Sequence, residues 1–254
     1  MQQARDLRQE GDELYALLRP LPEGDWLRAT PFKAWSVRDV VSHLHGTDKL
    51  ALASLKSREE FARALASGGR GATAPGAHRE LDSAELLARW RETFLEMCER
   101  FEATDARQRL AWVGPDMGAR MFATARQMET WAHGQDVYDL LGRERRPTDR
   151  LKNIAAIGVK TFGWSFANRG LEVPAPVPHV RLEAPSGAIW AWNEPRDDER
   201  IEGPALDFCY VVTQVRNALD TRLSTRGEVA ERWMAIAQCF AGPPEDPPEP
   251  GERV

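Results

Sequence analysis

The chain has 254 residues, of which 42% are hydrophobic and 29% are charged, and its formal net charge at pH 7 is −5. This is the composition of an ordinary globular protein with enough apolar material for one large domain or two small ones. The acidic balance and the lack of a long Lys/Arg cluster argue against a nucleic-acid partner. No apolar run approaches the ~18 residues that a membrane-spanning helix needs.

The cysteines Cys98, Cys209 and Cys239 are odd in number and far apart, and they form no CxxC pair. This spacing argues against a disulfide framework and against a cysteine-bound zinc. The N-terminal segment is polar and lacks the apolar core of a signal peptide. We therefore expect a cytoplasmic protein, a monomer or homodimer, that binds a small-molecule substrate and neither nucleic acid nor membrane.

Apolar residues recur with the period of an α-helix through most of the chain. Ser36 and Asp39 form an acidic version of a capping box, and Asp82 with Glu85 forms a second acidic capping pair. Gly142 is a natural residue to follow the end of a helix. The predicted helices cover residues 3–19, 37–55, 83–101, 122–141 and 148–170, with a Gly/Ala-rich connector over 68–76 and a turn over 112–118.

The character of the sequence changes after residue 170. Pro174, Pro176 and Pro178 predict an extended linker. Alternating stretches predict strands at 179–183, 188–192 and 201–203, and Pro204 suits the first position of a helix. A last helix is predicted over 228–240, and the Pro/Glu-rich end is predicted to be disordered. The predicted domains are a helical bundle over 1–170, a small α/β domain over 171–242 and a disordered tail over 243–254.

The helix over 122–141 carries ionisable residues along its apolar stripe. Arg126, Glu129, His133 and Asp136 follow one another at offsets of three, four and three. An unpaired charge buried in a core costs several kcal/mol, so these residues need partners. Two explanations remain open: a buried salt-bridge ladder, or a metal ion held by Glu129 and His133, which lie one helical turn apart.

The helix over 37–55 adds a histidine to this set. His43 lies at the edge of the apolar stripe, as a core histidine or a metal ligand would. The ring of His45 points about 200° away around the helix, so the two histidines are not expected to share an ion. Asp48, about one turn beyond His43, either reaches the same cavity or, as we prefer, lies at the surface. His78 is interpreted as a surface residue, and Trp35 as either a wall of the metal pocket or a helix staple.

Two motifs together resemble a known family. They are Trp35-Ser36-Val37-Arg38-Asp39-Val40-Val41-Ser42-His43-Leu44 and Arg126-x-x-Glu129-x-x-x-His133-x-x-Asp136. They resemble the DinB-like fold as used by mycothiol-dependent maleylpyruvate isomerases and their metal-binding relatives. Segments 184–187, 203–208 and 236–242 are similar to a subgroup in which a sterol-carrier-like domain follows the bundle. The resemblance implies an α+β protein: a DinB-like four-helix bundle followed by a small α/β domain.

By this resemblance His43, Glu129 and His133 are the metal ligands. The residues themselves agree, because one histidine from the second long helix and an i, i+4 pair from the fourth can converge in a bundle core. Two imidazoles and one carboxylate suit Zn²⁺, with a fourth position left for water or substrate. Ni²⁺ and Fe²⁺ accept similar ligands.

Arg126 and Asp136 are predicted to support the ligands from behind, with Arg126 paired to Asp39 or Glu129. In the family the C-terminal domain is thought to bind acidic substrate through an arginine. Arg216 is the nearest candidate here. We prefer to interpret it as a solvent-facing residue at a helix end and leave it out of the predicted site.

The resemblance implies that the metal binds mycothiol as a thiolate, which attacks an activated double bond, epoxide or halide. The enzyme would then be an isomerase or a thiol S-transferase. A metal-dependent hydrolase or lyase that uses metal-bound water is the second hypothesis. The third is a non-catalytic protein that binds a metal or a small hydrophobic molecule. Dependence of turnover on a thiol distinguishes the first hypothesis from the second.

Overall fold

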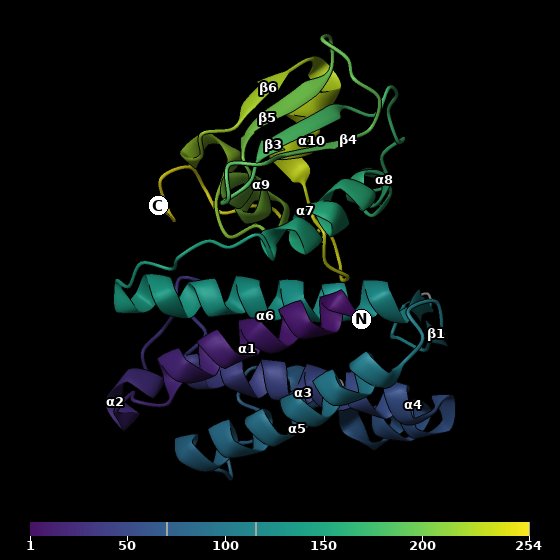
Figure 1. Ribbon diagram of the computed structural model, residues 1–254. Coiled ribbons are helices and arrows are strands. Elements are labelled where there is room, and N and C mark those ends of the chain that lie inside the picture. The colour runs from purple at the N-terminus through teal and green to yellow at the C-terminus, as the bar shows by residue number, and fades with distance from the viewer. Residues whose placement is uncertain (70, 115, 254) are drawn as a thin grey trace. The chain divides into compact units, whose positions relative to one another are not determined.

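The structure, a computed structural model, describes residues 1–69, 71–114 and 116–253. Arg70, Pro115 and Val254, which fall in the predicted connector, turn and tail, lie outside the described residues. The chain forms two compact units, Met1–Glu144 and Arg145–Val254, and each is described by itself (Figure 1). Helices dominate the first unit and a mixed sheet with helices forms the second, which confirms the predicted α+β class.

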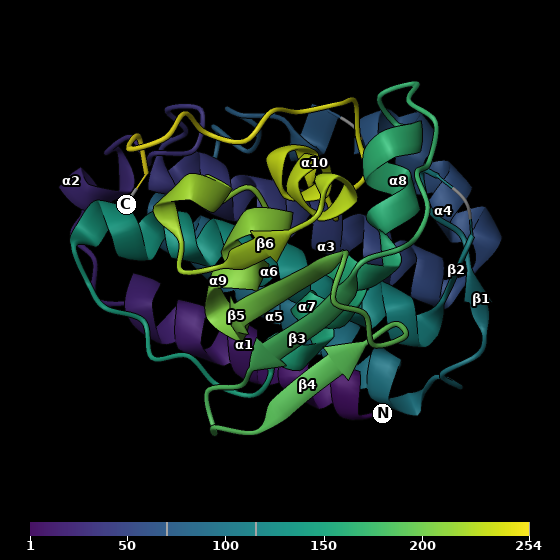
Figure 2. The same cartoon turned by 90° about the horizontal axis from the view of Figure 1, so that it is seen from above.

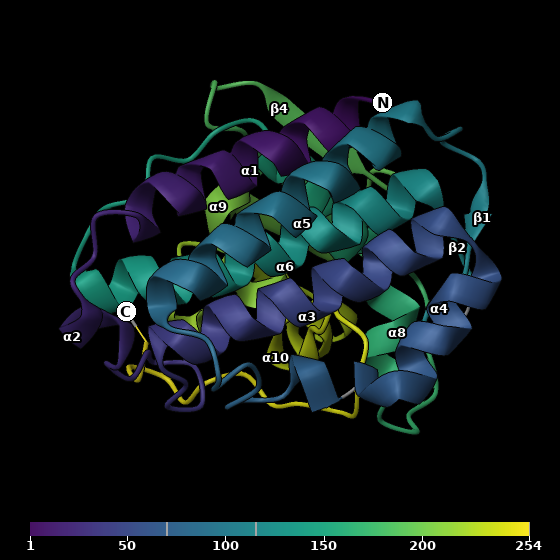
Figure 3. The ribbon, with the colours of Figure 1, turned by 90° about the horizontal axis from the view of Figure 1, so that it is seen from below.

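The first unit is a four-helix bundle. Helix α1 packs against α5 and α6, and α3 packs against the same two helices; Figure 3 shows α1, α5 and α3 lying side by side. The bundle helices are α1 (Gln2–Leu18), α3 (Val37–Lys56), α5 (Ser83–Ala103) and α6 (Ala119–Leu141). The shorter elements are α2 (Glu23–Trp26), α4 (Arg58–Ala64), η1 (Leu65–Gly69), η2 (Gly71–Thr73) and the antiparallel pair β1 (Arg109–Leu110) and β2 (Met117–Gly118).

The predicted caps of these helices are confirmed. The Ser36 side chain accepts a hydrogen bond from the Asp39 backbone N–H, and the Asp39 carboxylate accepts one from the Ser36 N–H, which completes the capping box. Asp82 caps α5 by accepting from the Glu85 N–H. Gly142 ends α6 with φ of +61°, a left-handed conformation that a residue without Cβ adopts at little cost. These caps fix where α3 and α6, the helices of the predicted site, begin and end.

The second unit contains a sheet with the strand order β4-β3-β5-β6, visible from above in Figure 2. Strand β3 pairs antiparallel with β4 and parallel with β5, and β5 pairs antiparallel with β6. Helix α9 packs against β3 and β5. The elements are α7 (Leu151–Lys160), α8 (Phe162–Ala167), β3 (His179–Glu183), β4 (Ile189–Trp192), β5 (Arg200–Pro204), α9 (Ala205–Val212), η3 (Ala218–Asp220), β6 (Ser224–Arg226) and α10 (Glu228–Ile236).

Several elements of the second unit differ from the prediction. The single helix predicted over 148–170 is two helices, broken at Thr161. The hydroxyl of Thr161 donates to the Ile157 and Gly158 carbonyls, and such side-chain bonds bend helices. Strand β6 was not predicted, and Pro204 caps α9 instead of being its first residue. The last helix ends at Ile236, before the predicted 240.

The boundary between the two units lies after Glu144, earlier than the predicted boundary at residue 170. Helix α7 packs against α9, and α8 packs against α10, so both belong to the second unit.

Residues 243–253, predicted to be disordered, follow a defined path along that unit. The Gln214 and Gln238 side-chain amides donate to backbone carbonyls of Glu245 and Pro243, which satisfies a Pro-rich backbone that cannot form a β-ladder. Among the described residues, no helix is long and apolar enough to cross a membrane.

Candidate metal centre

Helix α3 presents His43 and helix α6 presents Glu129 and His133. The core side of α3 is formed by Val40, Val41 and Leu44, all fully buried, so the His43 side chain lies at the edge of the packed face. Glu129 and His133 are four residues apart on α6, and side chains with this spacing lie one above the other on a helix. The predicted convergence of the two helices therefore occurs within one unit.

The ligand atoms of these residues are close together. His43 Nε2 lies 3.4 Å from Glu129 Oε2, and His133 Nε2 lies 3.7 Å from the same oxygen. One nitrogen or oxygen from each of the three residues falls within 4.8 Å of the others. Within 1–69, 71–114 and 116–253, no other three His, Cys, Asp or Glu side chains meet this criterion. The side chains are 17%, 23% and 11% exposed for His43, Glu129 and His133, so a small ligand can reach them.

The separations of 3.4 and 3.7 Å from Glu129 Oε2 fit a tetrahedral metal site. With bonds of about 2.1 Å, two ligands of a tetrahedral ion lie about 3.4 Å apart. His43 Nδ1 lies 2.8 Å from the Thr73 carbonyl oxygen, which only accepts, so Nδ1 carries the hydrogen. In the neutral ring the Nε2 lone pair then faces the carboxylate of Glu129, another acceptor. A positive charge between the two acceptors resolves this contact: either a proton on Nε2, which makes the contact with Glu129 a charged hydrogen bond, or a metal ion in its place. A backbone carbonyl behind a histidine is a common partner of metal ligands.

The electrostatics favour an ionised Glu129. Burial raises the pKa of its carboxyl, but the His43 hydrogen bond and the charges of His133, His43 and Arg126 outweigh it and hold the pKa at about 2. The residue is therefore an anion at neutral pH. One anion and two imidazoles form the donor set expected of a zinc site with an open position.

Arg126 and Asp48 form a buried ion pair next to the three candidate ligands. Arg126 Nε donates to Asp48 Oδ1 at 3.0 Å, its Nη2 donates to Thr47 Oγ1 at 2.8 Å, and the Trp90 indole N–H donates to Asp48 Oδ2 at 3.0 Å. The predicted surface position of Asp48 is wrong, because the residue is fully buried. Arg126 binds this aspartate rather than Asp39, whose carboxylate caps α3 and accepts from the Gly76 N–H. Since Arg126 precedes Glu129 by one turn, the pair ties together the two helices that carry the ligands.

Asp136 lies behind His133, as the prediction placed it. Its Oδ2 is 3.5 Å from His133 Nδ1, but the contact lacks hydrogen-bond geometry, and Nδ1 makes no hydrogen bond among the described residues. Asp136 is buried and has other polar interactions. The two imidazoles therefore have different contacts: His43 has a hydrogen bond to a backbone carbonyl, whereas His133 contacts aromatic rings.

Aromatic side chains surround the two histidines. The Trp35 ring stacks on His133 with an interplanar angle of 10° and a centroid distance of 5.8 Å, and lies 5.3 Å from His43. Phe32 meets His133 edge-on at 5.0 Å. Of the two interpretations of Trp35, its contacts with both rings support the pocket wall. Phe32 and Thr73 were missed by the sequence analysis, and the Thr73 group that meets His43 is a backbone carbonyl, which leaves no signal in the sequence.

His45 faces away from this site and contacts His78, with ring centroids 5.0 Å apart. The expectation that His45 and His43 do not share an ion agrees with the cluster found. His78 is not the surface residue we predicted, since only 14% of its side chain is exposed. Burial, together with His78, Lys49 and Arg89, lowers the pKa of His45 to about 4.

This low pKa predicts that acid destabilises the protein through His45. The unfolded histidine takes up a proton below about pH 6.5, whereas the folded one resists until about pH 4. The contribution of neutral His45 to the free energy of unfolding is therefore fully present above pH 6.5 and is lost as the pH falls toward 4. At pH 5 the loss is about 2 kcal/mol. Urea unfolding of chelator-treated protein at pH 7.5 and pH 5 measures this loss. The free energy of unfolding of His45→Gln should fall less between these pH values than that of wild type. An equal fall in both proteins would contradict the role of His45 in the acid sensitivity.

Arg216 lies in the second unit and is buried, which makes the solvent-facing interpretation wrong. Its guanidinium lies over the Tyr210 ring at 5.1 Å, and its Nη1 donates to the Val215 carbonyl at 3.1 Å. The cation–π contact and the backbone bond stabilise the turn that follows α9. These contacts give Arg216 a structural role within its own unit.

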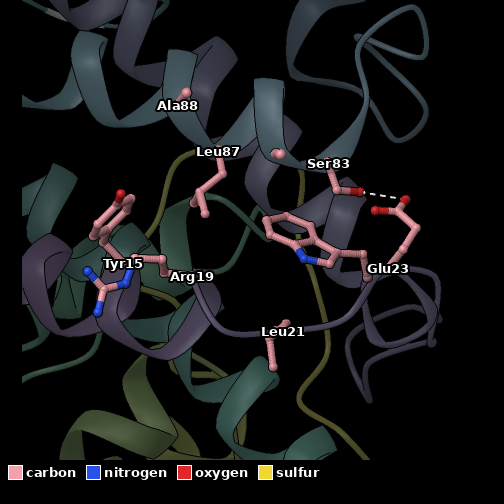
Figure 4. A pocket seen from close by; sticks show the side chains of 9 residues that line it. Tyr15, Arg19, Leu21, Glu23, Ser83, Leu87 and Ala88 are labelled. Atoms are coloured by element: carbon pink, nitrogen blue, oxygen red, sulfur yellow. Dashed lines mark hydrogen bonds between the residues drawn. The ribbon is translucent and has the colours of Figure 1, made fainter.

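A cavity of about 280 Å³ opens elsewhere in the first unit, between the end of α1, α2 and the start of α5 (Figure 4). The Ser83 hydroxyl donates to Glu23 Oε1 at 2.8 Å at its edge. None of the predicted site residues lines it. Its lining residues are Tyr15, Arg19, Leu21, Glu23, Trp26, Ser83, Ala84, Leu87 and Ala88.

A four-helix bundle with a His/Glu/His cluster on two of its helices defines a DinB-like class of protein. The chain belongs to the family described as mycothiol maleylpyruvate isomerase N-terminal domain, whose model matches residues 7–138. It is 41% identical over 244 residues to the uncharacterized protein Rv0036c of Mycobacterium tuberculosis H37Rv and to its counterpart MT0041 in strain CDC 1551. Each alignment covers 94% of this chain and 95% of the relative.

The fold is also similar to a solved structure, that of the mycothiol-dependent maleylpyruvate isomerase. The TM-score is 0.52 at 14% identity, over 83% of this chain and 87% of the other. A histidine-to-alanine mutant of that enzyme gives the same TM-score at 13% identity. At such identities the similarity establishes the fold, while the reaction has to be argued from the site.

Proposed function

We propose that the protein is a metal-dependent enzyme of the mycothiol-dependent isomerase or thiol S-transferase type, which activates a low-molecular-weight thiol for attack on a small electrophile. The observation that carries the proposal is the convergence of His43, Glu129 and His133 within 4.8 Å. Zn²⁺ suits this donor set best, and Ni²⁺ or Fe²⁺ are compatible with it. The family and the name of the related solved enzyme support mycothiol as the thiol.

The nucleophilic sulfur has to come from outside the chain. Cys98, Cys209 and Cys239 are all buried, and burial raises the pKa of the Cys98 thiol. A divalent ion, when bound, supplies a charge that favours the thiolate form of a coordinated thiol near neutral pH. The protein's own contribution is to hold the donor atoms in place and to limit access to them.

Each residue of the site has a defined task in this proposal. Glu129 supplies the single negative charge and stays ionised at neutral pH, because its pKa is about 2. His43 donates from Nδ1 to the Thr73 carbonyl, which directs Nε2 toward Glu129. Arg126 is occupied by Asp48 and Thr47, so its charge is largely compensated before any ion or substrate arrives. Trp35 stacks on His133 and Phe32 meets the same ring edge-on, so both side chains limit the access of water to it.

Thiol dependence of turnover tests the proposal. Zinc-loaded protein is incubated with mycothiol and a Michael acceptor, and the conjugate is followed by mass spectrometry together with proton release. We expect conjugate formation that requires mycothiol and is lost in His43→Ala. His179→Ala, which changes a partly exposed histidine of the second unit, is the matched control and should keep the activity.

The other outcomes point to the alternative functions. Equal conjugate formation by His43→Ala and wild type would contradict the proposal. Hydrolysis of an electrophile without any thiol would favour a hydrolase that uses metal-bound water. A fully zinc-loaded protein that turns over nothing in a broad electrophile panel would favour a metal- or small-molecule-binding role.

A further inference from the structure

The two histidines of the candidate metal centre are oriented by different means. A metal-binding histidine usually donates its second ring N–H to a carbonyl, carboxylate or water, which fixes the ring. His43 follows this rule through the Thr73 carbonyl at 2.8 Å. His133 does not: Asp136 Oδ2 lies 3.5 Å from its Nδ1 without making a hydrogen bond, and this buried Nδ1 has no other hydrogen-bond partner in the described part of the chain.

Rings take the place of that hydrogen bond. Trp35 lies nearly parallel to His133, Phe32 meets the same ring at an interplanar angle of 76°, and His43 meets it at 67° with centroids 4.9 Å apart. Contacts of this kind have preferred geometries and contribute about 0.5–1.5 kcal/mol per pair. Together the rings restrict the rotation of the His133 imidazole about its side-chain bonds.

The loop that carries Phe32 and Trp35 is built to hold them there. The Thr30 N–H donates to the Trp35 carbonyl at 2.7 Å, the Trp35 N–H donates to the Phe32 carbonyl at 2.9 Å, and Ala29 pairs with Ser36 in a β-bridge. Between the two aromatic residues, Lys33 and Ala34 have φ of +49° and +55°. Left-handed backbone costs a residue with a Cβ roughly 1–2 kcal/mol. Such strain persists where the surrounding structure imposes it, and here it accompanies two rings directed at one imidazole.

We propose that Trp35 is a positioning residue of the metal centre, which holds the His133 imidazole in its ligating orientation by stacking. The inference rests on the proposed function, since it requires His133 to bind an ion. Groups that orient a ligand from behind change metal affinity by about 10- to 100-fold when they are removed. Trp35 thereby does for His133 what the Thr73 carbonyl does for His43.

Zinc affinity of full-length variants tests this role. The dissociation constant is measured by competition with a chromophoric chelator for wild type, Trp35→Leu and Trp35→Phe. Trp35→Leu keeps apolar bulk but removes the ring, and should weaken zinc binding about 10- to 100-fold; Trp35→Phe restores a ring and should recover most of the affinity. Trp112→Leu is the control, because Trp112 packs on Phe122 and Phe61 in the same unit, and it should reduce thermal stability with unchanged affinity.

Fluorescence gives a second readout that a purely structural role would not change. Zinc binding should alter the emission of wild type and Trp112→Leu, and the alteration should disappear in Trp35→Phe. Wild-type zinc affinity in a folded Trp35→Leu, with only its melting temperature lowered, would overturn the positioning role while leaving the metal centre intact. Failure of wild type itself to bind zinc would overturn the proposed function, and the positioning role with it.

Discussion

Replacing Glu129 by glutamine is expected to weaken zinc binding by at least about 100-fold, more than the 10- to 100-fold expected of groups behind the ligands. The amide keeps the size of the side chain but removes the single negative charge of the ligand set. That charge is stabilised in the fold, since the pKa of Glu129 is held at about 2 by the His43 hydrogen bond and by His133, His43 and Arg126 against the effect of burial. Chelator competition on the purified full-length chain measures the change.

The two imidazole ligands are expected to behave in the same way. His43→Ala and His133→Ala should each lower the zinc content of the purified protein, whereas His179→Ala should leave it at the wild-type level. Zinc content that stays unchanged in either ligand variant would remove that residue from the ligand set. The comparison uses one kind of substitution throughout, so a general effect of losing a histidine is excluded.

Removing the buried arginine should have the largest effect on stability. Arg126→Met leaves Asp48 fully buried with the Trp90 indole as its one remaining hydrogen-bond partner among the described residues, and breaking such a pair costs about 3–5 kcal/mol. Guanidinium chloride unfolding of the metal-free protein at pH 8 should show this loss. The double variant Arg126→Met/Asp48→Asn removes the second charge and keeps an acceptor for Trp90, and it should regain at least half of the lost stability.

The loss in Arg126→Met should also depend on pH. Burial raises the pKa of Asp48, and the attraction of Arg126 opposes that rise; without Arg126 the folded carboxyl holds its proton to a higher pH than the unfolded one. A group of this kind destabilises the fold increasingly as the pH rises. The difference from wild type should therefore be smaller at pH 5 than at pH 8. A pH-independent loss, or a double variant no more stable than Arg126→Met, would contradict the ion-pair account.

The His43, Glu129 and His133 cluster could be proposed from sequence because its members lie on helices that leave local signals. Glu129 and His133 are one turn apart on a helix whose end is marked by Gly142, and Ser36 marks the start of the helix that carries His43. Helix caps and apolar periods are local properties, so they survive without knowledge of the tertiary fold. The same reasoning placed Arg126 and Asp136 beside the ligands.

The remaining parts of the site depend on tertiary contacts. Asp48 looks like an ordinary exposed acid in the sequence, and only the approach of Arg126 from another helix makes it a core residue. The Thr73 carbonyl is a backbone group, which any residue provides. Left-handed Lys33 and Ala34 are not glycines, so the loop that places Phe32 gives no signal in the sequence. Thr161 breaks a helix through its side chain in a stretch where the apolar period continues.

Anomalous diffraction at the zinc edge from crystals of the zinc-loaded full-length protein tests the central claim most directly. We predict one anomalous peak within about 2.0–2.2 Å of His43 Nε2, Glu129 Oε2 and His133 Nε2. Zinc bound elsewhere in the chain, or three side chains that stay apart with no peak between them, would contradict the account.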